Sequence, residues 1–369
     1  MRLLFQSIGV LVHYNWALPY YLTKLREESR IDNLTNFFSY FMGGYYYHLK
    51  SFGRVSPVFE EIGIGNVRTL DKMLKIMHIK KLMKKNYDII HLNRVVKDFC
   101  ETKVPKILTL HGICSDFEQC FDSFDACNVL REIQKCVEVI VAPSNHCAKA
   151  VKEACKIDVE VIHHGIDTEI FNPYIISKCK ARKILGLPLH NAIILWNARI
   201  SPEKNLEMAL KVLKRILKER KDVILLIKGR AADRNYMVKI RSLKKKLGLE
   251  HNVMFDHRWV PSMNKIAMYY RASDIYIHTS ITEAFGLAVA EAMACGIPVV
   301  AYRRSAVPEV VGDAGYLVND VEEFAEKVLE VLNNEKVRDY LSLKAVKRIH
   351  ERFSLKSTAS KYLQIYNKL

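Results

Sequence analysis

The sequence has few of the features that mark membrane, repeat or low-complexity proteins. None of its apolar runs approaches the roughly 20 residues that a membrane-spanning helix needs, and its start runs into polar and aromatic residues without a small-residue cleavage site. It has neither a low-complexity linker nor a repeat at solenoid spacing. We therefore expect a soluble, cytoplasmic protein.

Paired metal-binding cysteines are also missing. There are nine cysteines, eight of them between Cys100 and Cys179, but none forms a C-x-x-C pair. The odd number and the spacing favour free, buried thiols. The alternative is a metal cluster built from four side chains: His111, Cys114, Cys120 and Cys127. We expect no bound metal.

Acidic residues are too few to balance the basic ones, and the net charge is +17. Such a charge attracts phosphate-rich partners, which include nucleic acids, nucleotides and anionic membrane surfaces. Binding of single-stranded nucleic acid needs aromatic and basic residues interleaved on one surface, whereas the aromatic stretch from Asn36 to Phe59 carries few lysines. A basic nucleic-acid-binding protein is therefore a weak alternative, and we expect no nucleic-acid partner.

Short apolar runs alternate with helix-forming segments along the chain. Runs such as Lys106 to Leu110 and Val223 to Lys228 are too continuous for half-exposed strands and are typical of a parallel sheet that is covered on both faces. With 369 residues the chain is long enough for two such domains. We predict an α/β protein of two Rossmann-like, doubly wound domains that face a central cleft, spanning residues 1–170 and 171–354. A G-x-G-x-x-G signature is absent from its start.

Two stretches of the first half have no evident role. We interpret Asn36 to Phe59 as a packed irregular segment, with an acceptor-binding or membrane-facing loop as the alternative. Residues 71–86 are predicted to form an amphipathic basic helix. A surface helix is its plain interpretation, and docking on an anionic membrane surface is the alternative.

Basic residues cluster where a strand of the second half ends. Ser201 is expected as the N-cap and Pro202 as the first residue of a helix that reaches Arg220. Arg199 and Lys204 would then lie beside the positive end of that helix, which is unfavourable unless an anion binds there. The segment therefore predicts a diphosphate site.

Two glutamates bracket a predicted helix entrance. The strand Ile275–His278 leads through a loop to Glu283, and the helix expected from Ala284 to Cys295 contains Glu291, so the order is that of a βαβ unit. Eight helical steps would separate the carboxylates by roughly 12 Å along the axis. Two carboxylates so spaced can accept hydroxyls from two sugars joined by a diphosphate. Between them, the glycine of Phe285-Gly286-Leu287 marks a close approach of the backbone to a ligand.

Four segments together carry a resemblance to a known family. They read VIHHGIDTEIFNP, ARISPEKN, SDIYIHTSITEAFGLAVAEAMACGIPVVAY and PEVV. In this order they resemble the retaining GT-B glycosyltransferases of group 1, which use nucleotide sugars and include glycogen synthase-like and mannosyltransferase enzymes. The resemblance covers nearly all of residues 87–369 and is thin before them.

The resemblance implies a role for each matching position of the donor site. Glu291 matches the glutamate that accepts the ribose hydroxyls, and Glu283 matches the one at the donor sugar. The backbone amides at the donor sugar are those of Phe285, Gly286 and Leu287. The nucleotide base is expected near Gly229 and around Arg258-Trp259.

The remaining implied roles concern the phosphates and catalysis. Arg199 and Lys204 match the pair that neutralises the diphosphate as the leaving group. His111 matches a histidine that reaches the donor sugar from the N-terminal domain, and Gly9 lies in the loop that approaches the phosphates. By the resemblance, His111, Arg199, Lys204 and Glu283 are the candidate catalytic residues.

Further expectations concern the domains and the reaction. The acceptor would bind the N-terminal domain, and the final helix 355–369 would pack back onto it. The family's usual second strand is not evident in Ser29 to Tyr40. The chain has no D-x-D triplet, so no metal and no cofactor beyond the nucleotide sugar is expected.

We expect transfer of a hexose from a nucleotide diphosphate sugar to a hydroxyl acceptor, with retention of configuration. A lipid-linked acceptor at the inner membrane face is one option for the partner, and a glycan precursor is another. The alternative activity within the same fold is that of a nucleotide-sugar epimerase.

Overall fold

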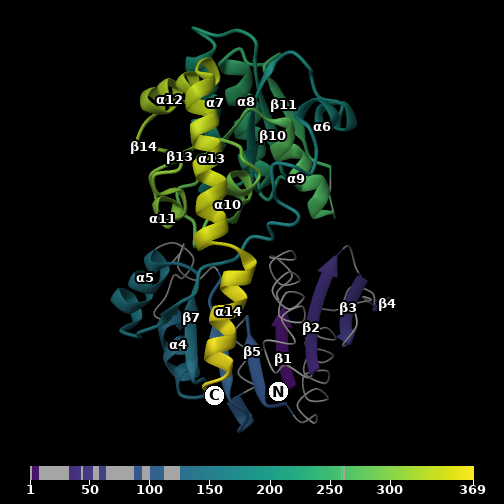
Figure 1. The fold of residues 1–369 in the computed structure, drawn as a ribbon, viewed down its shortest axis with the longest axis vertical. Coiled ribbons are helices and arrows are strands. Elements are labelled where there is room, and N and C mark those ends of the chain that lie inside the picture. Colours follow the sequence, from purple (N-terminus) through teal and green to yellow (C-terminus); the bar gives the residue numbers. More distant parts are fainter. Residues whose placement is uncertain are drawn as a thin grey trace. The chain divides into compact units, whose positions relative to one another are not determined.

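The computed structural model describes residues 2–7, 33–42, 45–52, 58–63, 87–93, 100–111, 125–258, 260 and 262–369. The predicted helix from Trp16 to Glu28 and the predicted basic helix 71–86 lie outside these residues. The chain divides into two compact units, which we call unit 1 (Met1–Gly165 with Leu355–Leu369) and unit 2 (Ile166–Ser354) (Figure 1). The sequence placed the division slightly later, after residue 170.

Unit 1 contains a sheet in the order β4-β3-β2-β1-β5-β6-β7-β8 among the described residues. From β2 to β8 the neighbouring strands are parallel, whereas β3 and β4 are antiparallel additions at one edge. The strands are β1 (Arg2–Ser7), β2 (Asn33–Met42), β3 (Tyr45–Phe52), β4 (Val58–Gly63), β5 (Ile89–Leu92), β6 (Lys106–Thr109), β7 (Val139–Ala142) and β8 (Glu160–Val161).

The interpretation of Asn36 to Phe59 as an irregular segment was wrong. Most of this stretch lies in β2, β3 and β4, and β2 is the second parallel strand that the sequence seemed to lack beside β1. Aromatic residues are strong strand formers, and the register pairs Met42 with Tyr45 across two intervening glycines in the sequence. A Gly-Gly pair between two aromatic runs is a hairpin signal, which the density of aromatic residues obscured.

The expectation of free thiols was also wrong for four cysteines. Disulfides join Cys100 to Cys136 and Cys127 to Cys155, whose Cα atoms lie 5.2 and 4.9 Å apart. Both distances fall in the range that a disulfide requires, and the pairs are 36 and 28 residues apart in sequence, so local spacing could not reveal them. The free cysteines of the described part are Cys147, Cys179 and Cys295. The same part of the chain has no group of three or more His, Cys, Asp or Glu side chains placed to hold a metal ion.

Helices α4 (Asp125–Gln134) and α5 (Asn145–Cys155) belong to unit 1, as does the last helix, α14 (Leu355–Tyr366). α14 is attached to β5 and β6 by buried polar contacts. The hydroxyl of Tyr366 lies 2.5 Å from Nδ1 of His91, and that of Tyr362 lies 2.8 Å from Oγ1 of Thr109. Burial, with a smaller effect of His111, lowers the pKa of His91 to about 3, so its ring joins these hydroxyls as a neutral group.

Unit 2 contains an all-parallel sheet in the order β11-β10-β9-β12-β13-β14. This is the doubly wound 3-2-1-4-5-6 order. Its strands are β9 (Ala192–Asn197), β10 (Val223–Lys228), β11 (Val253–Asp256), β12 (Ile275–His278), β13 (Val299–Tyr302) and β14 (Tyr316–Val318). Its helices are α6 (Lys178–Leu185), α7 (Leu206–Ile216), α8 (Arg234–Lys246), α9 (Met263–Ala272), α10 (Leu287–Ala294), α11 (Val307–Val311), α12 (Val321–Asn333) and α13 (Glu335–Arg352).

Alternate residues of one strand enter two separate hydrophobic cores. In β9, Ile193 and Leu195 pack in the core with α9, α10 and α13, whereas Ile194 and Trp196 pack in the core with α7, α8 and α12. Side chains of a strand alternate between the faces of a sheet, so helices cover this sheet on both faces, as Figure 1 shows. The α/β class and the two Rossmann-like sheets are therefore confirmed. No helix among the described residues is long and apolar enough to cross a membrane.

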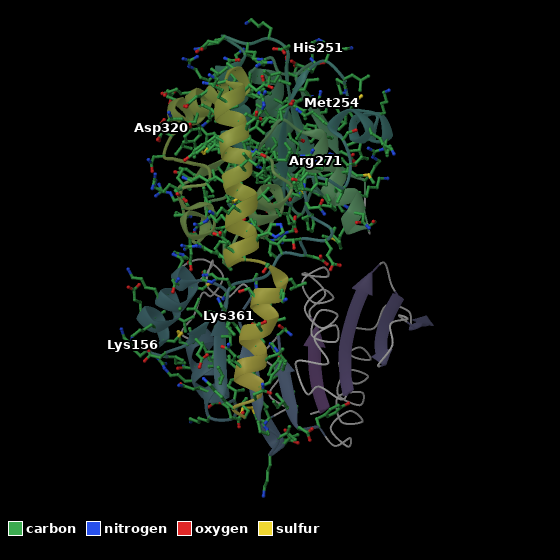
Figure 2. All side chains as sticks on the ribbon, viewed as in Figure 1. Lys156, His251, Met254, Arg271, Asp320 and Lys361 are labelled. Atoms are coloured by element: carbon green, nitrogen blue, oxygen red, sulfur yellow. A yellow bond between two sulfur atoms is a disulfide. The ribbon has the colours of Figure 1, made fainter. Side chains whose placement is uncertain are left out.

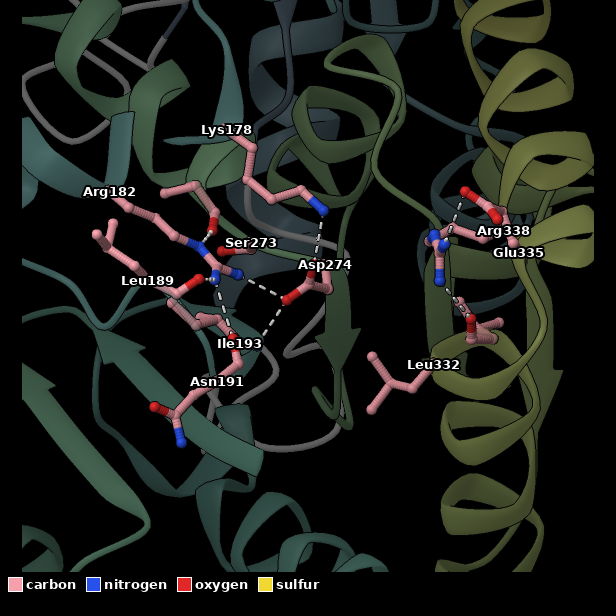
Figure 3. Close-up of polar contacts among 12 residues, drawn as sticks. Lys178, Arg182, Leu189, Asn191, Ile193, Ser273, Asp274, Leu332, Glu335 and Arg338 are labelled. Carbon is pink, nitrogen blue, oxygen red and sulfur yellow. Dashed lines mark hydrogen bonds and ion pairs between the residues drawn. The ribbon is translucent and has the colours of Figure 1, made fainter. Parts of the chain in front are cut away.

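A buried ion pair holds the start of unit 2 to its sheet. Arg182 on α6 donates to Oδ2 of Asp274 at 2.7 Å, the amide of Ile193 donates to the same oxygen at 2.7 Å, and Lys178 donates to Oδ1 (Figure 3). Asp274 thereby joins α6, β9 and β12. A comparable role belongs to Arg271 (Figure 2), whose guanidinium donates to the carbonyl of Cys295 after α10.

Candidate active site

The strand order of unit 2 defines where a ligand can bind. The chain leaves β9 toward β10 and β11 and returns to β12 on the other side of β9. In doubly wound sheets, ligands bind beyond the carboxyl ends of the strands at this switch point. The loop that contains Arg199 and Lys204 follows β9, and the loop that contains Glu283 follows β12. The topology therefore brings the two predicted segments to one place.

The loop after β9 differs from its prediction. A short 3₁₀ helix spans Pro202–Lys204, and α7 begins only at Leu206. Asn205 has a left-handed backbone (φ 50°) and accepts a hydrogen bond from the amide of Met208, so Asn205, and not Ser201, caps α7. A left-handed residue ends helical propagation, and an asparagine side chain is a good N-cap.

Side-chain and backbone hydrogen bonds join the loops after β9 and β12. Thr279 donates from Oγ1 to the carbonyl of Lys204 at 2.9 Å and accepts from the indole of Trp196 at 2.9 Å. The amide of Ile281 donates to the carbonyl of Glu203 at 2.9 Å. These bonds fix the two loops relative to each other within unit 2.

Lys204 and Glu283 meet across these loops. Lys204 Nζ donates to Glu283 Oε1 at 2.7 Å, and the two side chains are only 15% and 17% exposed. Nε2 of the buried His278 lies 3.3 Å from the same oxygen. Burial tends to raise the pKa of Glu283, but Lys204 and His278 together outweigh it and hold that pKa far below its usual value. The carboxyl is therefore an ionised hydrogen-bond acceptor.

The helix after this loop is shorter than predicted. α10 spans Leu287–Ala294 and is preceded by Gly286 with φ 101° at the N-cap. Because Glu283 lies before the helix, the predicted spacing of the two glutamates along one helix axis was wrong. The left-handed backbone at Gly286 is disfavoured for residues with a Cβ atom. It turns the chain so that the first amides of α10, which have no partner within the helix, follow directly after the Glu283 loop.

Glu291 lies on α10 and is largely buried. Tyr270 donates to its Oε2 at 2.8 Å, and Asn197 at the end of β9 donates to the Tyr270 hydroxyl at 2.9 Å. Burial raises the pKa of Glu291 to about 7, and the bond from Tyr270 only partly opposes this effect. Oε1 accepts no hydrogen bond from the described part of the chain. Glu291 can therefore accept hydroxyls from a ligand and changes its charge near neutral pH.

Arg199 is not joined to Lys204 or Glu283 by a direct contact. Its side chain is 62% exposed, and it pairs with Glu203 at 3.3 Å. The hydroxyl of Ser201 donates to the same oxygen of Glu203. An exposed pair of this kind contributes little to stability, so the Arg199 guanidinium can turn to an anion at small cost.

A further polar group, which the sequence did not reveal, lies at the ends of β10 and β11. Lys228 is buried 3.6 Å from Asp256, which also accepts from Arg258 at 2.6 Å and from Tyr269 at 2.5 Å. Burial opposes ionisation of Asp256, but the bonds from Arg258 and Tyr269 outweigh it and hold its pKa well below normal. The signal in the sequence that could have revealed this group is the pair of opposite charges at the two strand ends, Lys228 on β10 and Asp256 on β11.

Gly229 follows Lys228 and touches the loop after β9. A Cβ atom on this residue would lie 1.8 Å from the carbonyl oxygen of Ala198, so glycine is required here for the close approach. The base-binding role predicted around Gly229 and Arg258 stays a prediction, and Trp259 lies outside the described residues.

His111 belongs to unit 1, at the end of β6. Its Nε2 lies 2.6 Å from Oδ1 of Asn93 and its Nδ1 lies 3.3 Å from Nε2 of His164, on which the ring is stacked. Burial lowers the pKa of His111 to about 3, so the ring is neutral. The sequence did not single out Asn93 and His164, although both directly follow predicted strands. Gly9 lies outside the described residues.

Two family models match the chain. The model described as "Glycosyltransferase Family 4" matches residues 43–170, and the one described as "Glycosyl transferases group 1" matches residues 177–348. The two matches follow one another along the chain and together cover most of it. The second contains the Lys204, Glu283 and Glu291 positions.

Curated relatives include glycosyl-transferring enzymes of several specificities. The chain is 24% identical over 298 residues to N-acetyl-alpha-D-glucosaminyl L-malate synthase of Bacillus anthracis, which covers 77% of this chain and 75% of the relative. It is 31% identical over 218 residues to D-inositol 3-phosphate glycosyltransferase of Saccharomonospora viridis, with 56% of this chain and 49% of the relative covered. The chain thus spans about half the length of the second relative.

Solved structures share the fold over the whole chain. HepE of Anabaena, in complex with UDP and glucose, is 20% identical with a TM-score of 0.72, and all of both chains is covered. Sucrose-phosphate synthase of Thermosynechococcus elongatus is 18% identical with a TM-score of 0.73, with 100% of this chain and 98% of that chain covered.

Proposed function

The chain belongs to the group 1 glycosyltransferases with the GT-B fold, and we propose that it transfers a hexose from a nucleotide diphosphate sugar to a hydroxyl acceptor with retention of configuration. The observation that carries this proposal is the Lys204–Glu283 pair at the switch point of the unit 2 sheet. A buried cation and an ionised carboxylate at that place suit a ligand that carries both phosphates and hydroxyls.

In this proposal the cations stabilise the leaving group. Lys204 and Arg199 would neutralise the diphosphate, and the first amides of α10 would add the positive end of the helix dipole. Charge develops on the diphosphate as its bond to the sugar breaks, so groups held in place before the reaction stabilise the transition state most.

The carboxylates would bind hydroxyl groups of the donor. Glu283 is ionised and can only accept hydrogen bonds, which suits the sugar, and Glu291 would receive the ribose hydroxyls. We also propose that His111 of unit 1 binds the donor sugar. The variant His111→Ala should then lower transfer while the affinity for the free nucleotide stays nearly unchanged; an equal loss of nucleotide affinity would contradict this role.

The bond changes of the proposed reaction balance without another reactant. The acceptor oxygen forms a bond to the anomeric carbon as the bond from that carbon to the phosphate oxygen breaks, and the acceptor proton passes to the departing phosphate. Attack occurs on the face of the leaving group, which retains the configuration. Retaining hydrolases instead use a carboxylate nucleophile, whereas Glu283 is already engaged by Lys204.

The donor and the metal requirement are directly testable. HepE binds UDP and UDP-glucose in its solved complexes, which makes UDP sugars the first donors to test. Thermal-shift measurements with UDP-, GDP- and ADP-linked sugars should single out one, because a ligand at 100 times its dissociation constant adds roughly 2.7 kcal/mol. Since the sequence has no D-x-D triplet, turnover should persist in EDTA.

The acceptor defines the second experiment. We propose a lipid-linked sugar at an anionic membrane surface, since the chain carries a charge of +17. Incubation with a labelled donor, with and without a lipid-linked acceptor in anionic vesicles, should give an acceptor-dependent product whose anomeric configuration NMR determines. Conversion of the donor to another sugar nucleotide without acceptor would indicate an epimerase and contradict the proposal.

A further inference from the structure

A run of polar contacts connects Glu291 to the end of β9. The Tyr270 hydroxyl donates to Glu291 at 2.8 Å and accepts from the side-chain amide of Asn197 at 2.9 Å. Tyr270 is fully buried, so no water competes for these bonds. The hydroxyl therefore has a defined direction toward Glu291.

The same residue of β9 begins a second run toward Glu283. The Tyr276 hydroxyl lies 3.4 Å from the backbone carbonyl of Asn197 and 3.2 Å from Nδ1 of His278, and Nε2 of His278 lies 3.3 Å from Glu283. Tyr276 and His278 are 1% and 3% exposed. Four residues of unit 2, Tyr270, Asn197, Tyr276 and His278, thus connect the two proposed donor-binding carboxylates, and Asn197 takes part through both its side chain and its backbone carbonyl.

The Glu283 carboxylate is ionised, so His278 attracts it only when Nε2 of the ring carries a proton. The Tyr276 hydroxyl lies 3.2 Å from Nδ1 of His278 and can donate to that nitrogen, which leaves the proton of a neutral ring on Nε2. Nε2 is buried 3.3 Å from Oε1 of Glu283 but is not aligned for a hydrogen bond to it or to another described residue.

An unsatisfied buried ring nitrogen costs free energy. A leucine would fill the same space in the core without this cost, so packing alone does not explain a histidine at the end of β12. Such local violations of the packing rules concentrate at functional sites. The nitrogen faces the carboxylate that also binds Lys204, which indicates a role in placing that carboxylate.

We propose that His278 is a positioning residue that holds the Glu283 carboxylate in the orientation that receives the donor sugar. This inference rests on the proposed function, because Glu283 is taken as the ligand of the sugar. Tyr276, Asn197 and Tyr270 connect His278 to Glu291, so the sugar and ribose ends of the site share one buried support.

Two substitutions separate the nitrogens of His278. An asparagine places its amide group at about the position of Nδ1, where it keeps a bond to Tyr276, but it loses the group that faces Glu283. A glutamine places its amide nitrogen at about the position of Nε2 and has the opposite effect. The two variants are a matched pair with the same chemical group at different distances from the backbone.

The experiment measures the affinity of the full-length protein for UDP and UDP-glucose by calorimetry, or for the corresponding GDP-mannose or ADP-glucose pair if that sugar nucleotide gives the largest thermal shift. In His278→Asn, the preference for the nucleotide sugar over the free nucleotide should fall by about tenfold, because the Glu283 carboxylate loses the ring nitrogen that faces it at 3.3 Å. In His278→Gln the same preference should fall by less than about threefold. The affinity for the free nucleotide should be unchanged in both.

Other outcomes would overturn the inference. One such outcome is a larger loss of the preference for the nucleotide sugar in His278→Gln than in His278→Asn. Equal losses in both variants, or no loss in either, are the others. Each would mean that His278 serves the core and does not position Glu283. If His278→Asn does not fold, Tyr276→Phe removes the bond to Nδ1 and should lower the preference severalfold, and an unchanged preference would again count against the role. Wild-type protein that binds no sugar nucleotide would instead refute the proposed function itself.

Discussion

Nζ of Lys204 lies 2.7 Å from Oε1 of Glu283, although 79 residues separate them in the chain. The pair forms because β9 and β12 are neighbours in the sheet and because Thr279 connects the loops that follow these strands. Its members are largely buried, so each depends on the other for a counter-charge. The predictions below begin from this pair.

Replacement of Lys204 should impair the chemical step. In Lys204→Met the diphosphate loses a preorganised cation, and the transfer rate should fall by about 100-fold or more. The pKa of Glu283 should rise at the same time, since Lys204 is the main group that lowers it. Steady-state kinetics with the donor from the thermal-shift screen tests this, and Lys211→Met, an exposed position on α7, is the control. A rate like that of the control would remove Lys204 from the site.

Nucleotide affinity should depend on pH through Glu291. Burial raises its pKa to about 7, and the ionised carboxylate accepts stronger hydrogen bonds than the neutral acid. Affinity for the free nucleotide should therefore rise between pH 6 and pH 8 in the wild type. In Glu291→Gln the affinity should be lower at pH 8 and should lack this rise. Calorimetric titrations of both proteins at several pH values test this prediction. The same pH dependence of affinity in both would contradict the assignment of the rise to Glu291.

Asp274 should stabilise unit 2 at neutral pH. Asp274→Asn leaves the buried guanidinium of Arg182 without its counter-charge, and the loss should be about 2–4 kcal/mol. Burial tends to raise the pKa of Asp274, but Lys178, the Ile193 amide and Arg182 lower it overall. The stabilisation is therefore present above the carboxyl's unfolded pKa, about 4, and is lost as the pH falls through the lower folded value.

Denaturant unfolding followed by tryptophan fluorescence measures this difference at pH 7 and below pH 4. The control is Glu351→Gln, which removes an exposed pair with Lys347 at 3.8 Å and should change the stability by less than about 0.5 kcal/mol. A difference between wild type and Asp274→Asn that grows as the pH is lowered would have the wrong sign.

Gly229 should be irreplaceable because of its neighbour. In Gly229→Ala the new methyl group would meet the carbonyl of Ala198 at 1.8 Å, and the loops after β9 and β10 would have to separate. We expect a loss of about 2–4 kcal/mol, as for other overpacked or strained sites. Gly186→Ala is the matched control, because its left-handed backbone (φ 68°) has no atom within 4 Å of the new group and costs only about 1 kcal/mol. Equal thermal shifts in the two variants would disprove the close-approach argument.

Local sequence patterns were most informative where a residue's role depends on its neighbours in the chain. The apolar runs of unit 2 predicted its buried strands, and the predicted spans Val223–Lys228 and Val253–Asp256 agree with β10 and β11. Helix starts were less well predicted. The left-handed backbones of Asn205 and Gly286 set where α7 and α10 begin, and a helical periodicity of apolar residues does not encode such a turn.

The disulfides and the antiparallel edge of unit 1 were not predicted for a similar reason. Cys127 and Cys155 come together only because α4 and α5 pack against each other. The aromatic residues around Tyr45 form strands because β2 offers a free edge to β3. In both cases the deciding contact joins segments that a local pattern treats as separate.

The sequence by itself determined the βα alternation of the chain, the family and the candidate residues, because apolar periodicity and motif spacing are local properties. Only the tertiary structure decided which candidates meet. It paired Lys204 with Glu283, left Arg199 exposed, buried Glu291 in contact with Tyr270 and placed His278 3.3 Å from the Glu283 carboxylate. The physical reason is that charge, pKa and hydrogen-bond direction depend on burial and on neighbours across the sheet, and the strand order sets both.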